Sequence, residues 1–294
     1  MSSTTTITTT TVVDPPTVTK AELKSKDFVP RGNKSSSPFN TTLYLGLRAL
    51  DCYWQYLVLS AGYGTVIVRL LRGTVIQPAP SVSETGIASL DNLLLGLGLP
   101  LHSAVLLTMN VLAALKHFWF VLRVAEEAWT LPGAIIVGLD NIFFDTINQL
   151  LYLCAATTAY EAGASAASNS YLLAGVALFA VGIAAECICE VDRKLFKADP
   201  RNKGKAYTGG LFAVVRHPNY AAFTIWRAGL AVASSGATAG LLIAAFFTWD
   251  FSNRAVPALN EYCTKRVSFQ YPFHSYHFSG PRFCWWQHKH TKKK

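Results

Sequence analysis

The pattern of apolar and polar positions divides the chain into long apolar stretches joined by shorter polar connections. A helix needs about 20 residues to cross the hydrocarbon core of a bilayer, and six stretches approach or exceed this length. They cover roughly 50–71, 92–115, 133–157, 171–190, 211–234 and 237–253. The pattern therefore predicts an all-α fold, a polytopic transmembrane helical bundle of about six spans.

The flanking regions differ from this pattern. Residues 1–40 are rich in Ser, Thr and Pro and bury too little apolar surface to fold, so we expect a disordered tail. After this tail we expect three parts: N-terminal transmembrane helices in 41–169, a second membrane domain in 170–286 that contains a ligand-binding loop at 192–220, and a basic tail in 287–294.

Two features inside the apolar stretches bear on the site. Pro100 lies within the second stretch and predicts either a kink or a late helix start. The third stretch carries polar side chains that suggest either a polar channel or hydrogen bonds between helices. They are Asp140, Asn141, Asp145 and Asn148.

Composition supports the membrane interpretation. Hydrophobic residues make up 51% of the chain and charged residues 15%, and the mean hydropathy is +0.28; soluble domains average about 25% charged residues. The net charge of +9 does not indicate nucleic acid, because the basic residues flank apolar stretches, as the positive-inside rule expects. The six cysteines form no CxxC motif and no paired zinc-ligand spacing, so no metal site is predicted. The expected partners are the lipid bilayer and a lipophilic small molecule.

The Lys and Arg distribution predicts the orientation. The 192–207 connection and the C-terminal tail are both strongly basic, which places both termini in the cytosol and 158–170 on the opposite side. Arg69 and Arg72 are exceptions to this rule. A multi-pass protein with cytosolic basic loops and no evident signal peptide is expected in the endoplasmic reticulum.

Residues 186–229 concentrate the titratable side chains next to apolar sequence. Six basic side chains lie between Arg193 and Lys205, where charge and glycine backbone N–H groups can bind phosphates, although an ordinary positive-inside loop explains the charge alone. The chain then re-enters apolar sequence through Arg216-His217-Pro218-Asn219-Tyr220. Pro218 suits the first turn of a helix whose N-terminus favours an anion.

These motifs resemble the steroid 5-alpha-reductase-like membrane family, in particular its uncharacterised fungal and bacterial branch. The resemblance rests on Asp192-Arg193-Lys194, Phe196-Lys197, Asn202-Lys203-Gly204-Lys205, Gly210-Leu211, Arg216–Tyr220, Val256–Glu261, Tyr276, Phe283 and Trp286. Sterol C14- and C24-reductases share the Arg-His-Pro-Asn-Tyr core. Isoprenylcysteine and phospholipid methyltransferases share an Arg-His-Pro core and a related helical fold.

The resemblance implies a membrane oxidoreductase of lipid metabolism. Its NADPH would add hydride to a C=C bond of a sterol-like or other lipophilic enone, and an acid would supply the proton. The cofactor site would be lined by Lys197, Asn202, Lys205, Arg216, His217, Asn219 and Tyr220. The catalytic residues would be Tyr220, Glu261 and His217; Asp145 is a chemically possible acid that no motif supports.

The chain departs from the family pattern at two places, and three functions therefore stay open. Ala222 and Phe223 replace the family's Gly-Glu, and Asn260 replaces a Glu. The first function is the NADPH reductase, which the basic loop favours because NADPH carries three phosphates. The second is an S-adenosylmethionine-dependent isoprenylcysteine or phospholipid methyltransferase. The third is a non-catalytic membrane scaffold, which the missing carboxylates suggest.

Overall fold

The computed structural model describes residues 32–76, 96–161, 168–203, 205–260 and 262. The predictions made for 1–31 and for the C-terminal tail, including Glu261, Tyr276, Phe283 and Trp286, lie outside the described residues. Within them the fold is helical, and the extended pairing consists of one isolated antiparallel bridge between Val75 and Cys154. The all-α prediction is confirmed.

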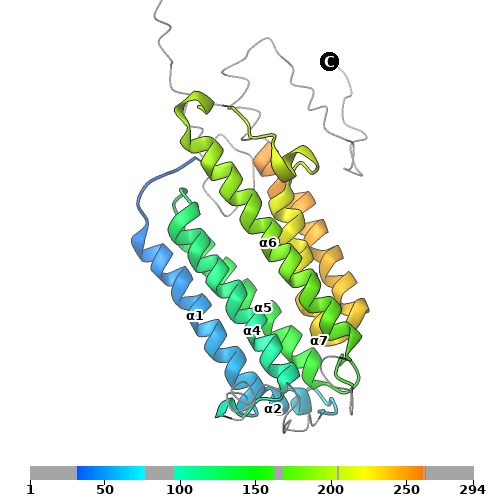
Figure 1. Cartoon of the computed structure of the whole chain (residues 1–294). Coiled ribbons are helices and arrows are strands. Elements are labelled where there is room, and N and C mark those ends of the chain that lie inside the picture. The colour runs from blue at the N-terminus through cyan, green and yellow to red at the C-terminus, as the bar shows by residue number, and fades with distance from the viewer. Residues whose placement is uncertain (1–31, 77–95, 162–167, 204, 261, 263–294) are drawn as a thin grey trace, which may run out of the picture.

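Long helices run between the two ends of the bundle (Figure 1). They are α1 (Pro38–Ser60), α4 (Leu101–Trp119, extended by the π turn Phe120–Val124), α5 (Leu131–Leu153), α6 (Ser170–Ala198) and α7 (Pro218–Asp250, extended by the π turn Phe251–Ala255). The short helix α2 (Tyr63–Leu70) and the 3-10 turns Pro200–Asn202 and Gly210–Ala213 lie in the connections.

Helix α7 is a hairpin of two antiparallel arms, 218–235 and 237–250. At Gly236 the backbone leaves the helical region, with φ 79° and ψ −174°. The rings of Phe223 and Phe247 lie 5.2 Å apart, whereas a straight helix would separate these residues by about 36 Å. The fifth and sixth predicted spans are therefore present and meet at Gly236. The fifth begins at Pro218 rather than at residue 211, because 210–213 form a 3-10 turn.

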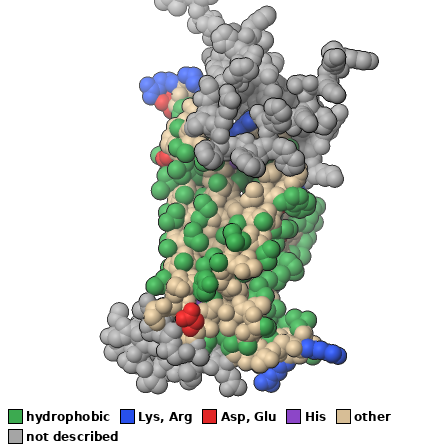
Figure 2. Space-filling model, turned by 90° about the vertical axis from the view of Figure 1, so that its right-hand side faces the viewer, with side chains coloured by type: hydrophobic (Ala, Val, Ile, Leu, Met, Phe, Trp, Pro, Cys, Tyr) green, Lys and Arg blue, Asp and Glu red, His purple; other side chains and the backbone are tan. Residues whose placement is uncertain are grey.

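Four helices of the described part, α4, α5, α6 and α7, are long and apolar enough to cross a membrane. Helix α1 passes along the same bundle, and α7 passes along it twice (Figure 1). Figure 2 shows apolar side chains along the sides of the molecule and Lys and Arg side chains toward its two ends. This distribution fits a protein that spans a bilayer.

The first predicted span, 50–71, is wrong in its bounds. Helix α1 begins at Pro38 and ends at Ser60, so residues 38–40 are not part of a disordered tail. The chain then turns at Gly62, with φ 80°, into α2. The pattern missed the first turns because α1 buries polar side chains, which lower the hydropathy of that stretch; they include Arg48, Asp51 and Gln55.

Two other helix ends also differ from expectation. Pro100 precedes the first residue of α4, so it marks a late helix start and not a kink. Helix α6 continues to Ala198, about two turns beyond the predicted end at residue 190, and the charged run after it is therefore helical. The basic side chains of this run consequently extend from the end of a helix.

Both ends of the described chain lie at the end of the bundle that carries the 199–217 connection (Figure 1). Gly32 N donates to Glu127 Oε1 at 3.0 Å, and a hydrogen bond from Lys34 lowers the pKa of Glu126. Arg69 lies in the last turn of α2, at the opposite end. The compartment that each end faces stays a prediction, and Arg69 remains an exception to the charge rule.

Helices α6 and α7 approach each other at glycines. A Cβ atom added at Gly182 would lie 2.6 Å from Trp226 N, and one added at Gly229 would lie 2.6 Å from Phe179 N. Small residues allow such backbone approach between membrane helices, where packing rather than hydrophobic burial drives association. The close approach fixes the height of Trp226 against α6.

We therefore expect Gly182→Ala to lower the free energy of unfolding by about 1–3 kcal/mol, the usual cost of overpacking a filled interface. Gly46→Ala is the matched control, because Gly46 lies in α1 with nothing within 4 Å of its added Cβ. That control should be neutral or stabilising by up to about 1 kcal/mol. Thermal unfolding in detergent measures both; equal midpoints for the two variants would contradict the packing argument.

Candidate functional site

The start of α7 carries two of the predicted site residues, His217 and Tyr220. Pro218 occupies the first turn of the helix, and His217 is its N-cap residue. His217 Nε2 lies 3.2 Å from Asn260 Oδ1, and the Tyr220 ring stacks on Phe251 at 4.7 Å. The hairpin in α7 produces both contacts, because it returns residues 251–260 to the first turn of the same helix. Asn260, which replaces a family Glu, thus has a polar partner in His217.

The other predicted cofactor residues lie at the same end of the bundle (Figure 1). Lys197 is in the last turn of α6, and Lys197, Lys205 and Arg216 are all exposed. Asn202 donates from Nδ2 to the carbonyl oxygen of Phe196 at 3.1 Å and so caps the end of α6. Asn219 is half-buried in the first turn of α7.

At least three of the six basic side chains in 193–205 bind protein groups. Arg193 pairs with Glu190, Lys194 donates to the carbonyl oxygen of Arg123, and Arg201 pairs with Asp199. The hydrogen bonds from Arg201 also lower the pKa of Asp199, which keeps that carboxylate ionised at neutral pH. The positive charge available for a ligand is therefore smaller than the sequence suggests.

An aromatic cluster lies directly inside this end of the bundle. The Phe223 ring contacts Trp226 at 4.8 Å, Phe247 at 5.2 Å and Phe251 at 5.4 Å. With Tyr220 these side chains form what we call the aromatic lining: Tyr220, Phe223, Trp226, Phe247 and Phe251. Ala222 is buried against α6 near Gly182, where a larger side chain would push the helices apart. Of the two residues that replace the family's Gly-Glu, Ala222 therefore packs against α6, whereas Phe223 joins the aromatic lining.

A carboxylate from another helix lies beside the aromatic lining. Glu186 of α6 accepts from Trp226 Nε1 at 2.7 Å and from Lys116 Nζ at 2.8 Å. The Lys116 ammonium also lies 5.0 Å from the Trp226 ring centroid. The sequence analysis did not assign Lys116 or Glu186 to the site. In the sequence, these two residues stood out only as one positive and one negative side chain, each near the end of an apolar stretch.

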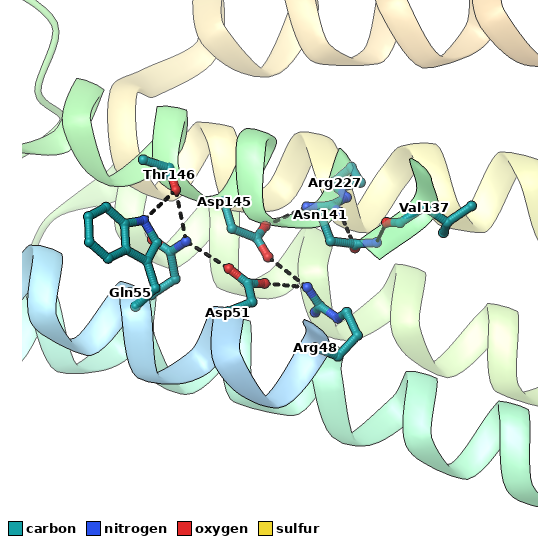
Figure 3. A network of polar contacts seen from close by, with 9 residues as sticks. Arg48, Asp51, Gln55, Val137, Asn141, Asp145, Thr146 and Arg227 are labelled. Carbon is teal, nitrogen blue, oxygen red and sulfur yellow. Dashed lines mark hydrogen bonds and ion pairs between the residues drawn. The ribbon is translucent and has the colours of Figure 1, made fainter. Parts of the chain in front are cut away.

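Deeper in the bundle, a charged network joins α1, α5 and α7 (Figure 3). Asp145 accepts from Arg48 Nη1 at 3.2 Å and from Arg227 Nη1 at 2.5 Å. Asp51 pairs with Arg48 and accepts from Gln55 Nε2 at 2.8 Å. The two Arg and two Asp side chains are at most 1% exposed. A charge in a membrane interior is costly unless it is paired, and here two positive side chains are matched by two negative ones.

This network changes the interpretation of Asp145. A carboxylate held between two guanidinium groups is stabilised as an anion, so it is poorly suited to the acid role that its chemistry alone permitted. The sequence analysis missed Arg48, Asp51, Gln55 and Arg227. A usable signal was present in α1, where Arg48, Asp51 and Gln55 follow the i, i+3, i+7 spacing of one helix face.

We expect Asp145→Asn to destabilise the protein by about 3–5 kcal/mol, because it leaves two buried arginines with one carboxylate. The matched control is Asp250→Asn, which breaks the more exposed i,i+4 pair with Arg254 and should cost less than about 1 kcal/mol. Thermal unfolding in detergent compares them. A smaller loss for Asp145→Asn than for Asp250→Asn would show that the network is not a main source of stability.

Comparison with known proteins adds a family. A model described as "Protein of unknown function (DUF1295)" matches residues 133–278. The chain is 64% identical over 260 residues to "Probable O-methyltransferase ustE" of Ustilaginoidea virens, covering 88% of this chain and 90% of that relative. No solved structure matches the chain. The chain therefore belongs to the same family as this relative, and residues 133–278 of the chain match the DUF1295 model.

Proposed function

We propose that the protein is a membrane-embedded O-methyltransferase that transfers the methyl group of S-adenosylmethionine to a hydroxyl of a lipophilic acceptor. The observation that carries the proposal is the aromatic lining between the Arg216–Tyr220 turn and the buried charges. The high identity to a relative named "Probable O-methyltransferase ustE" supports it. Because of this relative, we favour a hydroxyl acceptor over the isoprenylated cysteine or phospholipid that the motifs alone suggested.

The residues at this end fit S-adenosylmethionine by their chemistry. A sulfonium is a cation, and the ring of the half-buried Tyr220 offers it the attraction that aromatic rings give to cations. The exposed guanidinium of Arg216 suits the carboxylate of the cofactor. The N-terminus of α7 adds partial positive charge next to Arg216.

S-adenosylmethionine, when bound, supplies an electrophilic methyl group. The residues of this chain bind and orient it: His217 is held by Asn260, and Tyr220 is held against Phe251. A C–O bond forms as the C–S bond breaks, and the bonding electron pair stays on sulfur. The acceptor hydroxyl must also lose its proton to a base. The roles of His217 and Tyr220 are then to position the donor, and any role of Glu261 stays a prediction.

A second candidate is the NADPH-dependent reductase. The basic side chains Lys197, Lys205 and Arg216 at one end of the bundle favour it, because NADPH carries three phosphates. Two observations weigh against it. At least three of the six basic side chains in 193–205 bind protein groups, and Phe223 occupies the place of a family carboxylate.

The deciding experiment is equilibrium binding of S-adenosylmethionine and of NADPH to the detergent-purified full chain. We expect saturable binding of S-adenosylmethionine, weakened at least about tenfold by Arg216→Gln, because a charged hydrogen bond contributes about 1.5–3 kcal/mol. Arg201→Gln is the matched control, since Arg201 is an exposed arginine of the turn Pro200–Asn202 and not of the start of α7, and it should leave the affinity unchanged.

Other outcomes would overturn the proposal. Binding of NADPH alone, lost in the Lys197, Lys205 and Arg216 triple charge-removal variant, would move the protein to the reductases. Binding of neither cofactor by folded protein would support the scaffold hypothesis. An equal effect of Arg201→Gln and Arg216→Gln would remove Arg216 from the cofactor site.

A further inference from the structure

Side chains from four helices form a closed series of contacts in the bundle interior. The Tyr44 and His117 rings lie 6.3 Å apart, and the His117 and Trp226 rings 6.0 Å apart. Arg227 lies 4.7 Å over the Trp226 ring and pairs with Asp145, which in turn binds Arg48, one helical turn after Tyr44. We call this set the interior ring: Tyr44, Arg48, His117, Asp145, Trp226 and Arg227.

The interior ring carries buried polar atoms that have no hydrogen-bond partner among the described residues. They are His117 Nδ1, Arg48 Nε and Nη2, and Arg227 Nε. Arg48 and Arg227 are at most 1% exposed, and His117 is 8% exposed. A network that served packing alone would pair such atoms, since an unsatisfied buried polar group costs free energy. These atoms are therefore able to form hydrogen bonds with a polar group that a ligand brings.

A further buried polar side chain extends the set along α4. Asn110 is 1% exposed, and neither of its amide atoms has a partner among the described residues. It lies seven residues before His117, so the two side chains share one face of α4. The unpaired groups thus follow the interior side of that helix from His117 inward.

The charges define the ligand class. Arg48 and Arg227 are balanced by Asp51 and Asp145 within the network. A carboxylate ligand would add an uncompensated charge to a buried site, which is strongly unfavourable. A neutral hydroxyl avoids this cost: its oxygen can accept from a guanidinium N–H, and its proton can be donated to His117 Nδ1.

The aromatic members define the body of the ligand. Tyr44 and Trp226 lie on either side of His117, and flat apolar ligands pack well against such rings. Because the surrounding helices are long and apolar enough to cross a membrane, a lipophilic molecule suits this interior. An aromatic ring that bears a hydroxyl, a lipophilic phenol, meets each of these requirements.

We propose that the interior ring binds the hydroxyl-bearing end of a lipophilic phenol, the methyl acceptor, and that His117 accepts its proton. The inference rests on the proposed function. The proton moves from the phenol oxygen to His117 Nδ1, while Arg48 and Arg227 donate hydrogen bonds to the developing phenolate. That oxygen forms the new C–O bond as the C–S bond breaks, and the sulfur keeps the electron pair.

The two sites are neighbours along α7. Tyr220 of the donor site and Trp226 of the interior ring are six residues apart on α7, about 9 Å by helical rise. Phe223 lies between them and contacts Trp226. The aromatic lining therefore extends from the proposed donor site to the proposed acceptor site.

The test measures binding of 1-naphthol to the detergent-purified full chain by quenching of tryptophan fluorescence, with no cofactor present. We expect saturable quenching, with at least tenfold weaker binding of naphthalene and of ionised 1-naphthoic acid. His117→Phe keeps an aromatic ring and removes the nitrogens, and it should weaken 1-naphthol binding about tenfold. His117→Gln restores a polar side chain and should recover part of the affinity.

His102→Phe is the matched control. His102 is also buried on α4, but its Nε2 lies 2.9 Å from the carbonyl oxygen of Ala233, away from the interior ring. This variant should keep the wild-type affinity for 1-naphthol; His102→Gln replaces it if thermal unfolding shows that it does not fold. Equal affinities of wild type and folded His117→Phe, or equal affinities for 1-naphthol and naphthalene, would overturn the proposal. Tighter binding of 1-naphthoic acid than of 1-naphthol would overturn the phenol class.

The two proposals fail in different ways. If S-adenosylmethionine binds but His117→Phe leaves 1-naphthol binding unchanged, the interior site is wrong and the methyltransferase stands. If 1-naphthol binding depends on His117 but S-adenosylmethionine does not bind, the acceptor role is overturned together with the proposed function. A methyl-transfer assay at rising pH adds a second readout: His117→Phe should lower kcat most at low pH, where the phenol needs a base.

Discussion

The carboxylate of Asp145 holds the bundle together by binding two guanidinium groups at once. Arg48 reaches it from α1 and Arg227 from α7, and Asp51 supplies the second negative charge. Each of these groups would be costly in an apolar interior if it stood alone. Because the charges balance only when α1, α5 and α7 are in register, the network restricts how these helices can slide past one another.

The register has consequences for the rest of the interior. The family model matches residues 133–278, so α1 and α4 precede the matched region. Yet Arg48 and His117 of these helices contact the same interior as Arg227 and Trp226. The N-terminal helices are thus part of the candidate site and not only a membrane anchor for the matched region.

The hairpin in α7 builds the other half of the site. The turn at Gly236 folds the second arm back along the first, so that Phe247, Phe251 and Asn260 meet residues of the first turns. The glycines at the α6–α7 contact set the depth of Trp226. A polar turn that suits a charged cofactor, an aromatic lining and a buried polar interior then follow one another along a single helix.

The sequence by itself determined the fold class, most of the apolar helices and the concentration of chemistry around Arg216–Tyr220. Hydropathy and charge are local properties, which is why the fourth to sixth stretches were found, with errors of up to about two helical turns at their ends. It did not determine the extent of α1, because Arg48, Asp51 and Gln55 look unfavourable in a membrane until their partners are known.

Only the tertiary structure decided which distant side chains meet. Glu186 pairs with Lys116 across 70 residues, and Asp145 meets Arg48 across 97, so neither pairing leaves a local pattern. Phe223 is a similar case. The sequence showed only that it replaces a family Glu, whereas the structure shows that its ring is part of the aromatic lining. Paired charges and ring contacts depend on helix register, and register is set by the packing of the whole bundle rather than by any one stretch.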